Sequence, residues 1–291
     1  RRPPISTLFP YTTLFRSEAQ FMDNRPIGVF DSGLGGLTAM RELIRTLPNE
    51  NILYFGDTGR VPYGSRGREI IRKYAKQDMN FLIRHDVKAV LAACGTVSSV
   101  ARDIGDALPV PYFDVLRPTA RAAVEQTKNG KIGIIGTAAT IASGSYRKEI
   151  ERLAPKTEVF EQACPLFVPL VENAFVSPDD PIPRLTAERY LTPIREAGVD
   201  TLILGCTHYP IISETIRRVM GENVTLISSG REAAKSCRTV LEENGLLCDG
   251  KTDGTQQYFV SDDTESFYKV AELFLGQSVE SCVECIDIER Y

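Results

Sequence analysis

The stretch Lys88-Ala89-Val90-Leu91-Ala92-Ala93-Cys94-Gly95-Thr96 has a counterpart in the second half of the chain, Asp200-Thr201-Leu202-Ile203-Leu204-Gly205-Cys206-Thr207-His208. A second pair shows the same relation: Ile27-Gly28-Val29-Phe30-Asp31-Ser32-Gly33 is matched by Ile132-Gly133-Ile134-Ile135-Gly136-Thr137-Ala138. In each stretch an apolar run leads into a turn, and in nearly all of them that turn carries hydroxyl side chains. Because the two pairs occur in the same order and at similar spacing, they indicate a duplicated α/β unit.

Short apolar runs alternate with longer segments of helical periodicity along the chain. This alternation is typical of parallel sheets covered by helices on both faces, with reactive groups at the carboxyl ends of the strands. The predicted strands are Ile27–Phe30, Ile52–Phe55, Ala89–Ala93, Tyr112–Leu116, Ile132–Ile135, Glu158–Gln162, Thr201–Leu204 and Thr225–Ser228. The predicted helices are Leu37–Leu47, Arg68–Arg84, Ser98–Leu108, Arg117–Lys128, Ala139–Leu153, Leu185–Ala197 and Ile211–Met220.

The duplication places the seam between the two units near Leu116–Thr119, with a return to the first unit near Ser228–Gly230. We therefore expect a first α/β domain of residues 22–116 plus 229–291 and a second of residues 117–228. Residues 1–21 stand outside this plan, because they resemble the translation of a sequencing-library adaptor rather than a signal peptide. We expect them to be a non-native leader; a genuine N-terminal extension is the alternative.

The composition argues against nucleic-acid and membrane partners and indicates a reducing compartment. Of the 291 residues 43% are hydrophobic and 25% charged, which is ordinary for a soluble globular protein. A formal net charge of −4 gives no electrostatic reason to expect nucleic acid or an anionic membrane as a partner. The seven cysteines are odd in number and scattered, which favours reduced thiols in a cytosol over a disulfide framework. We expect a cytoplasmic protein.

Cys94 and Cys206 stand at equivalent points of the duplication, where a buried strand should end and a helix begin. Backbone N–H groups and the positive end of a helix dipole favour a thiolate in such a turn. Inverting an amino acid at Cα requires two acid–base groups that flank a planar carbanion, and two thiols meet that requirement. A lone cysteine of this kind is more often a small buried hydrophobic residue, but its recurrence in both halves favours catalysis.

A helix dipole alone is not expected to activate these thiols. Lowering a thiol pKa from about 8.5 to about 7 requires roughly 2 kcal/mol of preferential thiolate stabilisation. A helix N-terminus usually supplies about 0.3–1 kcal/mol. A further neighbour is needed, and His208, two residues beyond Cys206, is the candidate. The other histidine, His85, lies in a polar stretch and is expected at the surface.

Two loops that follow the first two strands carry further candidates. In Asp31-Ser32-Gly33-Leu34-Gly35-Gly36, Ser32 can donate to a carboxylate, and Asp31 can hold an ammonium group or assist Cys94. Asp31 could instead only cap the helix, and the glycine spacing is not a phosphate-binding pattern. The loop 56–64 combines turn formers with charge and an aromatic ring, which points to the same crevice. Cys282-Val283-Glu284-Cys285 has no second ligand pair, so no metal site is predicted.

Together these motifs resemble those of the glutamate racemase family, and the similarity runs in order from about Arg25 to Gly276. The segments that carry it are Asp31-Ser32-Gly33-x-Gly35-Gly36, Gly56-Asp57-Thr58-x-Arg60-x-Pro62-Tyr63-Gly64, Cys94-x-Thr96, Gly136-Thr137-x-Ala139-Thr140, Cys164-Pro165-Leu166-Phe167-Val168-Pro169-Leu170-Val171-Glu172, Gly205-Cys206-Thr207-His208-Tyr209-Pro210 and Phe259-Val260-Ser261-Asp262.

The resemblance implies an enzyme that interconverts L- and D-glutamate for peptidoglycan synthesis without a cofactor. It also implies two pseudo-symmetric α/β domains, each a mostly parallel sheet flanked by helices, with the active site in the cleft between them. Carried over by position, Cys94 serves the D-enantiomer and Cys206 the L-enantiomer. The implied assisting groups are Asp31, Glu172 and His208. The implied substrate-binding residues are Asp31, Ser32, Tyr63, Gly64, Gly95, Thr96, Thr207 and His208.

Gly95 departs from the family pattern, which usually has Asn at this position. The glycine keeps a backbone N–H but loses an amide donor and acceptor. A missing polar contact to a charged substrate is worth about 1.5–3 kcal/mol, or roughly 10- to 150-fold in affinity. A hydroxyl group of Thr96, Ser98 or Ser99, or a water molecule, could compensate for it.

Two other functions remain open at this stage. A racemase of another acidic amino acid, such as aspartate, would use the same pair of thiols. A non-catalytic protein that kept the cleft would be favoured by loss of Cys94, Cys206 or His208, and all three are present. No lysine stands in a context that singles it out for pyridoxal phosphate. The sequence allows a homodimer but does not decide the oligomeric state.

Overall fold

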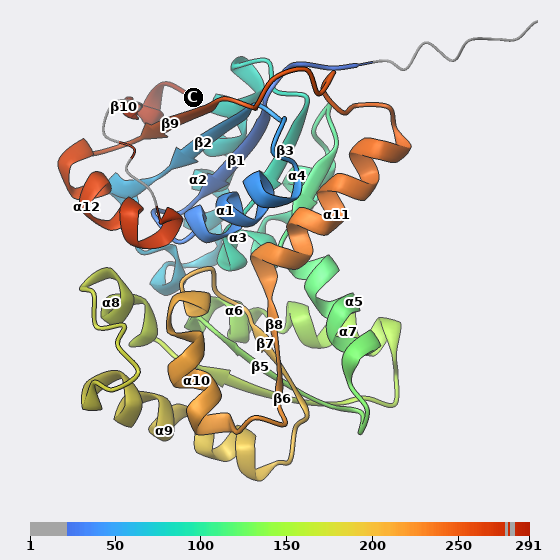
Figure 1. The fold of residues 1–291 in the computed structure, drawn as a ribbon, viewed down its shortest axis with the longest axis vertical. Coiled ribbons are helices and arrows are strands. Elements are labelled where there is room, and N and C mark those ends of the chain that lie inside the picture. The colour runs from blue at the N-terminus through green and yellow to red at the C-terminus, as the bar shows by residue number, and fades with distance from the viewer. Residues whose placement is uncertain (1–21, 277–278, 280–282) are drawn as a thin grey trace, which may run out of the picture.

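The computed structural model of the chain describes residues 22–276, 279 and 283–291. The predicted leader and Cys282 lie outside the described residues. Figure 1 shows two lobes that meet at a waist, each built around one sheet. Among the described residues no helix is both long enough and apolar enough to cross a membrane.

All strand pairs described are parallel, in two sheets. The upper sheet has the order β10-β9-β2-β1-β3-β4 and the lower sheet the order β6-β5-β7-β8. The upper strands are β1 (Ile27–Asp31), β2 (Ile52–Gly56), β3 (Ala89–Ala92), β4 (Tyr112–Asp114), β9 (Gln256–Val260) and β10 (Val283–Cys285). The lower strands are β5 (Lys131–Gly136), β6 (Glu158–Ala163), β7 (Thr201–Leu204) and β8 (Thr225–Ser228).

The duplication predicted from the sequence is visible in the strand order. The run β2-β1-β3-β4 of the upper sheet has the same topology as β6-β5-β7-β8 of the lower sheet. The register agrees as well. Phe30 of β1 pairs with Ala92 of β3, and the equivalent residue Ile135 of β5 pairs with Leu204 of β7. The prediction of two pseudo-symmetric α/β units with parallel sheets is confirmed.

Helices cover both faces of each sheet. They are α1 (Leu37–Thr46), α2 (Arg68–Arg84), α3 (Gly95–Val100), α4 (Arg102–Asp106), α5 (Leu116–Gln126), α6 (Ala138–Ser143), α7 (Ser145–Leu153), α8 (Phe167–Glu172), α9 (Pro181–Glu196), α10 (Ser213–Met220), α11 (Ser229–Glu243) and α12 (Thr264–Leu275). Successive residues of β1 show the two faces: Val29 belongs to the apolar cluster that includes α1 and α11, and Phe30 to the one that includes α2. Strands buried on both faces explain the continuous apolar runs in the sequence.

Several predicted elements differ in their bounds, and α9, predicted from Leu185, begins four residues earlier at Pro181. The helix predicted over Ser98–Leu108 is divided between α3 and α4, and the one over Ala139–Leu153 is interrupted at Gly144, whose φ of +61° favours glycine. The strand predicted over Tyr112–Leu116 ends at Asp114. The Asp114 carboxylate accepts the backbone N–H groups of Leu116 and Arg117, both at 2.8 Å, and this starts α5.

Candidate active site

The two cysteines occupy equivalent positions, one in each lobe. Cys94 follows β3 and is the N-cap residue of α3. Cys206 follows β7 and precedes a short 3-10 helix, Tyr209–Ile212, that leads into α10. Both thiols are buried and neither forms a disulfide. Because β3 and β7 are equivalent strands, each sheet carries one of the two thiols at the carboxyl end of the same strand.

Both cysteines line a single cavity of about 340 Å³ between the lobes, within the usual range for a small-molecule site. Every residue of the predicted catalytic and substrate-binding set borders this cavity, whereas Ser98 and Ser99, named as possible substitutes for the missing amide at position 95, do not. The bordering residues of the set are Asp31, Ser32, Tyr63, Gly64, Cys94, Gly95, Thr96, Glu172, Cys206, Thr207 and His208. The structure thus brings together all residues of this set, from loops far apart in the sequence.

Cys94 has a hydroxyl and a carboxylate as neighbours. Its thiol donates to the hydroxyl oxygen of Ser32 at 3.4 Å. Burial, reinforced by the charge of Asp31, raises the pKa of the Cys94 thiol to about 12. Asp31 is itself buried and accepts the backbone N–H of Gly33 at 3.0 Å. Burial raises the pKa of Asp31, while the charge of His208 opposes that rise.

Cys206 has an imidazole as its neighbour. His208 Nδ1 lies 3.8 Å from Cys206 Sγ, and His208 Nε2 lies 3.0 Å from a carboxylate oxygen of Glu172. Burial lowers the pKa of His208, but the hydrogen bonds to Cys206 and Glu172 outweigh it and raise the pKa to about 10. His208 therefore carries a positive charge at neutral pH, and a cation beside a sulfur stabilises the thiolate form.

The two cysteine turns touch through glycines. A Cβ atom on Gly95 would collide with the carbonyl oxygen of Gly205, the residue before Cys206. A Cβ atom on Gly35 would likewise collide with the ring of His208 in the other lobe. The lobes are also joined by the hydroxyl of Thr38, which donates to the carbonyl oxygen of Thr207 at 2.7 Å. Glycine at position 95 therefore has two effects: it lets the two cysteine turns approach closely, and it removes the amide that the family usually has there.

Tyr63 borders the cavity, but its hydroxyl is bonded elsewhere. That hydroxyl is within hydrogen-bond distance of Asp57 and donates to Asp78 at 3.0 Å. Arg60 pairs with the same two carboxylates, at 2.6 Å to Asp57 and 3.1 Å to Asp78. Tyr63 is fully buried. Tyr63 can therefore contact a ligand through its backbone or the edge of its ring, but not through its hydroxyl.

Thr137 is a cavity residue that the sequence reasoning missed. Its hydroxyl lies 3.1 Å from that of Thr96 and 2.9 Å from that of Thr140, so it links the two lobes at the edge of the cavity. The duplication could have identified Thr137, because Thr137 occupies the position equivalent to the predicted site residue Ser32. Other lining residues outside the predicted set are mostly apolar: Val61, Pro62, Ala138, Pro165, Val168 and Pro169.

No group of three or more metal-ligating side chains occurs within the part of the chain that the structure describes. Cys285 of the CxxC stretch is exposed on β10.

Comparison with known proteins agrees with this geometry. The model of the Asp/Glu/Hydantoin racemase family matches residues 27–237. The chain belongs to this family. It is 44% identical over 253 residues to a glutamate racemase of Geobacter metallireducens, covering 87% of this chain and 93% of the relative. A glutamate racemase of Thermoanaerobacter pseudethanolicus is also 44% identical, over 270 residues, covering 93% of this chain and all of the relative.

Solved structures extend the comparison. The crystal structure of a Francisella tularensis glutamate racemase in complex with D-glutamate superposes with a TM-score of 0.86 at 40% identity, covering 92% of this chain and all of that one. A Picrophilus torridus aspartate racemase superposes with a TM-score of 0.56 at 16% identity, covering 76% of this chain and 94% of that one, and shows a shared fold alone. The resemblance to glutamate racemases read from the sequence is confirmed.

Proposed function

We propose that this chain is a glutamate racemase that interconverts L- and D-glutamate with Cys94 and Cys206 as its two acid–base groups and without a cofactor. The observation that supports this most strongly is the single cavity between the lobes, bordered by one buried thiol from each of two equivalent strands. The D-glutamate would serve peptidoglycan synthesis, and we propose that the enzyme works in the cytoplasm.

In the L-to-D direction, the thiolate of Cys206 removes the Cα proton and leaves a planar carbanion. The thiol of Cys94 then delivers its proton to the opposite face, which gives the D-enantiomer. The enzyme is left with a thiol at Cys206 and a thiolate at Cys94, and the D-to-L direction runs through the same steps in reverse. Two groups of the same kind suit this exchange, because each must act as acid in one direction and as base in the other.

The remaining candidates divide into assisting and binding roles. We propose that His208, held by Glu172, assists Cys206, and that Asp31 assists Cys94 or holds the substrate ammonium group. The proposed contacts to the substrate come from Asp31, Ser32, Tyr63, Gly64, Gly95, Thr96, Thr207 and His208. What supports these roles is that all of these residues border the same cavity.

We also propose the domain division drawn from the duplication, residues 22–116 plus 229–291 and residues 117–228. The strands on either side of these limits support it. β4 ends at Asp114 in the upper sheet, β8 ends at Ser228 in the lower sheet, and β9 returns to the upper sheet. The chain thus crosses the waist twice, before α5 and before α11. Relative movement of the domains would change the width of the cavity.

The test is turnover of L-glutamate beside L-aspartate, followed by circular dichroism. We expect loss of optical activity with glutamate and far slower loss with aspartate. Cys237→Ala is a matched control, since Cys237 is a buried thiol on α11 that does not border the cavity, and it should racemise glutamate as the wild type does. Faster turnover of aspartate would replace the proposed substrate, and no turnover of either would favour a binding protein.

A further inference from the structure

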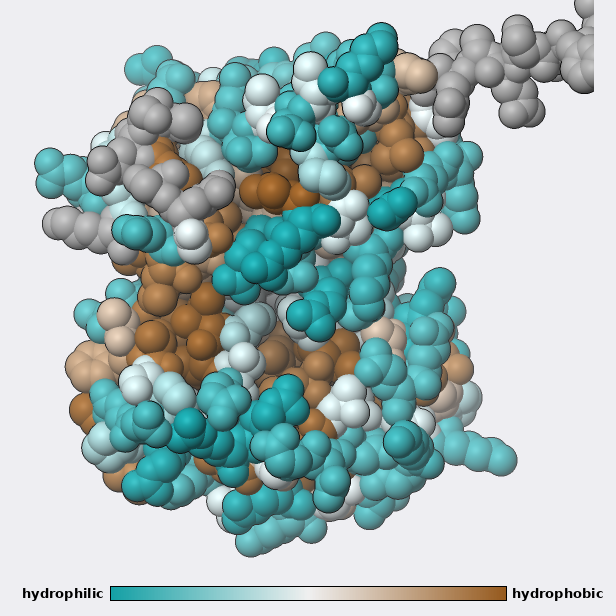
Figure 2. All heavy atoms as spheres, viewed as in Figure 1, coloured by the Kyte–Doolittle hydropathy of each residue, from teal (hydrophilic) through white to brown (hydrophobic). Residues whose placement is uncertain are grey.

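A second cavity is lined by residues of α1 in the upper lobe, α10 in the lower lobe and the start of α11. Figure 1 shows these three elements near the waist. It encloses about 220 Å³. Its lining is rich in arginine: Arg41 and Arg45 from α1, Arg217 from α10 and Arg231 from α11. Figure 2 shows strongly hydrophilic side chains gathered at this waist, beside apolar surface.

Positive charge in this cavity is in excess. Glu42 is its one acidic lining residue, and it pairs with Arg45 at 3.2 Å and Arg231 at 3.5 Å. Among the residues that the structure describes, neither Arg41 nor Arg217 has an ion-pair partner, and Arg41 Nε is buried without a hydrogen-bond partner. Burial and the repulsion of Arg45 lower the pKa of Arg41. A buried, unpaired guanidinium N–H is costly unless an acceptor reaches it.

Neutral donors complete the lining. Ser213 and Ser228 border the cavity, and Ser228 is the N-cap residue of α11 without a side-chain capping bond. The first turn of this 15-residue helix therefore has backbone N–H groups that no capping side chain satisfies. Helix N-termini with such N–H groups favour anions such as phosphate.

We propose that this cavity, bordered by arginines from both lobes and by the start of α11, binds the phosphate group of a small anion. Guanidinium groups match phosphate oxygens in bidentate geometry. Four arginines against one glutamate call for a ligand with at least two negative charges, which a phosphate group supplies and a single carboxylate does not. The ligand would join α1 to α10, close to the bond between Thr38 and Thr207 at the active site.

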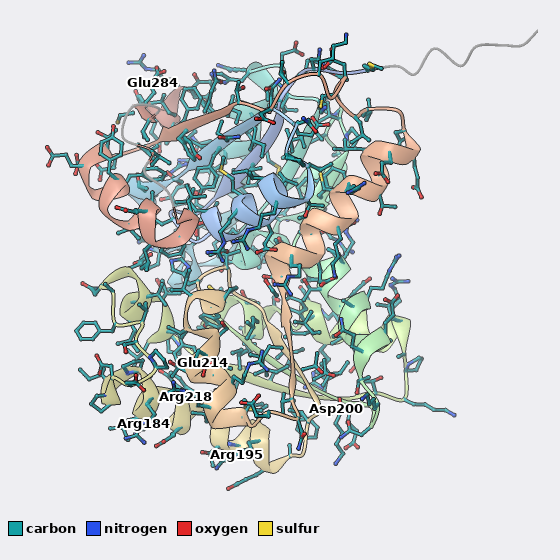
Figure 3. The ribbon with its side chains drawn as sticks, viewed as in Figure 1. Arg184, Arg195, Asp200, Glu214, Arg218 and Glu284 are labelled. Atoms are coloured by element: carbon teal, nitrogen blue, oxygen red, sulfur yellow. The ribbon has the colours of Figure 1, made fainter. Side chains whose placement is uncertain are left out.

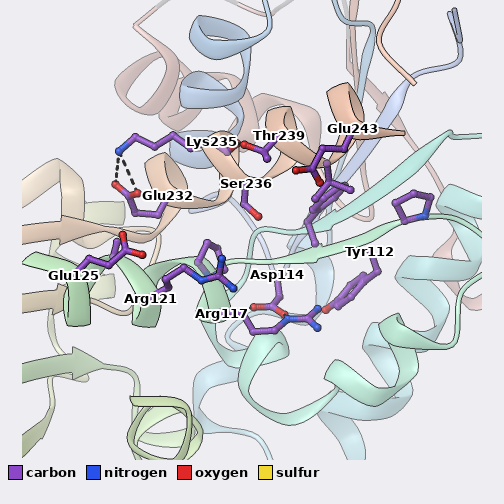
Figure 4. A pocket seen from close by; sticks show the side chains of 15 residues that line it. Tyr112, Asp114, Arg117, Arg121, Glu125, Glu232, Lys235, Ser236, Thr239 and Glu243 are labelled. Carbon is purple, nitrogen blue, oxygen red and sulfur yellow. Dashed lines mark hydrogen bonds and ion pairs between the residues drawn. The ribbon is translucent and has the colours of Figure 1, made fainter. Parts of the chain in front are cut away.

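A larger cavity on another side of the waist provides a contrast. It encloses about 740 Å³ between α5 and α11 and is also lined by basic residues (Figure 4). There two of the three basic residues are paired within the protein: Arg117 with Asp114 at 2.5 Å and Lys235 with Glu232 at 2.9 Å. Its four acidic lining residues outnumber its three basic ones, so it lacks the excess of positive charge that an anion site requires.

The first test is binding of inorganic phosphate and of glycerol phosphate to the full chain by titration calorimetry at constant ionic strength. We expect saturable binding tighter than about 1 mM. Arg217→Gln should weaken it by about 10-fold or more, since a charge-assisted hydrogen bond is lost. Arg218→Gln is the matched control on the same helix, because Arg218 pairs instead with Asp179 and Glu214, and this variant should bind as the wild type does. Figure 3 labels Arg218 and Glu214 on the lower lobe.

Tighter binding of glycerol phosphate would assign the site to phosphorylated metabolites, and tighter binding of inorganic phosphate to the free ion. The second test needs no variant: phosphate should protect Arg217 and Arg231 of the wild type, but not Arg218, from modification by phenylglyoxal. Absence of saturable binding by either ligand overturns the proposal. So does an equal loss of affinity in Arg217→Gln and Arg218→Gln, or equal modification of Arg217 with and without phosphate.

Discussion

The two cysteine turns share a backbone plan but differ in the charges placed beside the sulfur. Cys94 lies near the carboxylate of Asp31, and burial together with that charge raises its pKa to about 12. Cys206 lies 3.8 Å from His208, whose own pKa is raised to about 10 despite burial by its hydrogen bonds to Cys206 and Glu172. The two positions are equivalent in the backbone, but the residues around them make the two thiols chemically unlike.

This difference predicts a preferred resting state. We expect the proton to rest on Cys94, while the imidazolium of His208, 3.8 Å from the sulfur of Cys206, can stabilise negative charge that forms there. By the proposed assignment, that state is ready to accept L-glutamate. The D-enantiomer requires the proton to have moved, which is the state that the L-to-D reaction leaves behind. The asymmetry is therefore expected in proton exchange and in individual rate constants, since the two enantiomers have equal free energy and kcat/KM must be the same in both directions.

The largest expected effect is the loss of either thiol. Cys94→Ser and Cys206→Ser should each lower racemisation by about 10²–10⁴-fold or more, because a serine hydroxyl is a far weaker acid and base than a thiol. Optical rotation of L- and D-glutamate solutions measures this. Wild-type activity in either variant would show that the cysteine it lacks is not one of the two acid–base groups.

The next effect concerns the charge that only the Cys206 turn has. His208→Gln should lower kcat/KM by roughly 10- to 150-fold in both directions, through loss of a charge-assisted hydrogen bond. In the wild type the imidazolium is present below a pH of about 10 and is lost as the pH rises through that value. The ammonium group of free glutamate also loses its proton close to this pH, so the two enzymes are compared by the steepness of the fall. We expect kcat/KM to fall more steeply above pH 10 in the wild type than in His208→Gln. Equal steepness in both would assign the fall to the substrate and not to His208.

A smaller effect is expected where the two turns touch. Gly95→Ala places a Cβ atom against the carbonyl oxygen of Gly205, and relieving that overlap must separate the turns. Overpacking of this kind costs about 1–3 kcal/mol, so we expect kcat/KM to fall about 10-fold. Gly67→Ala is the control, because no atom lies within 4 Å of its added Cβ. Gly95→Asn should resemble Gly95→Ala; activity above wild type would mean that the missing amide matters more than the contact.

The smallest expected change in activity is that of Tyr63→Phe. Its hydroxyl is bonded to Asp57 and Asp78, away from the cavity, so kcat and KM should stay within about twofold of wild type. Stability should fall by about 1–3 kcal/mol, because two buried carboxylates lose a donor. Denaturant unfolding and steady-state kinetics of the same preparation measure both. A large rise in KM at unchanged stability would show that the hydroxyl reaches the substrate.

The sequence predicted much of the fold because strands of parallel sheets are apolar throughout. Thr201–Leu204 and Arg68–Arg84 were predicted with the bounds that the structure has. α11 was missed, since its buried face is made of Ala233, Ala234, Cys237 and Leu241, which are mostly small residues with a weak apolar signal. β9 and β10 were missed because they lie toward one edge of the sheet and show little continuous apolar sequence.

For the site, the sequence predicted which residues gather at the cavity, but it did not predict the contacts that those residues make. The cavity gathers the whole predicted catalytic and substrate-binding set, yet the direction of the Tyr63 hydroxyl depends on Asp78, which a different helix supplies. Thr137 could have been found by carrying Ser32 across the duplication. The role of Gly95 could not, because its contact with Gly205 depends on how closely the two lobes approach, and no local pattern encodes that distance.

The most direct test of the two-thiol account is Cα proton exchange in deuterated water by the two single variants, followed by NMR. For racemisation, kcat/KM must be the same in both directions. Exchange of the Cα proton without inversion has no such constraint, so its rate can differ between the enantiomers. We predict that Cys94→Ser, which keeps Cys206, exchanges the proton of L-glutamate alone, and that Cys206→Ser exchanges that of D-glutamate alone. Exchange of the same enantiomer by both variants would contradict the account.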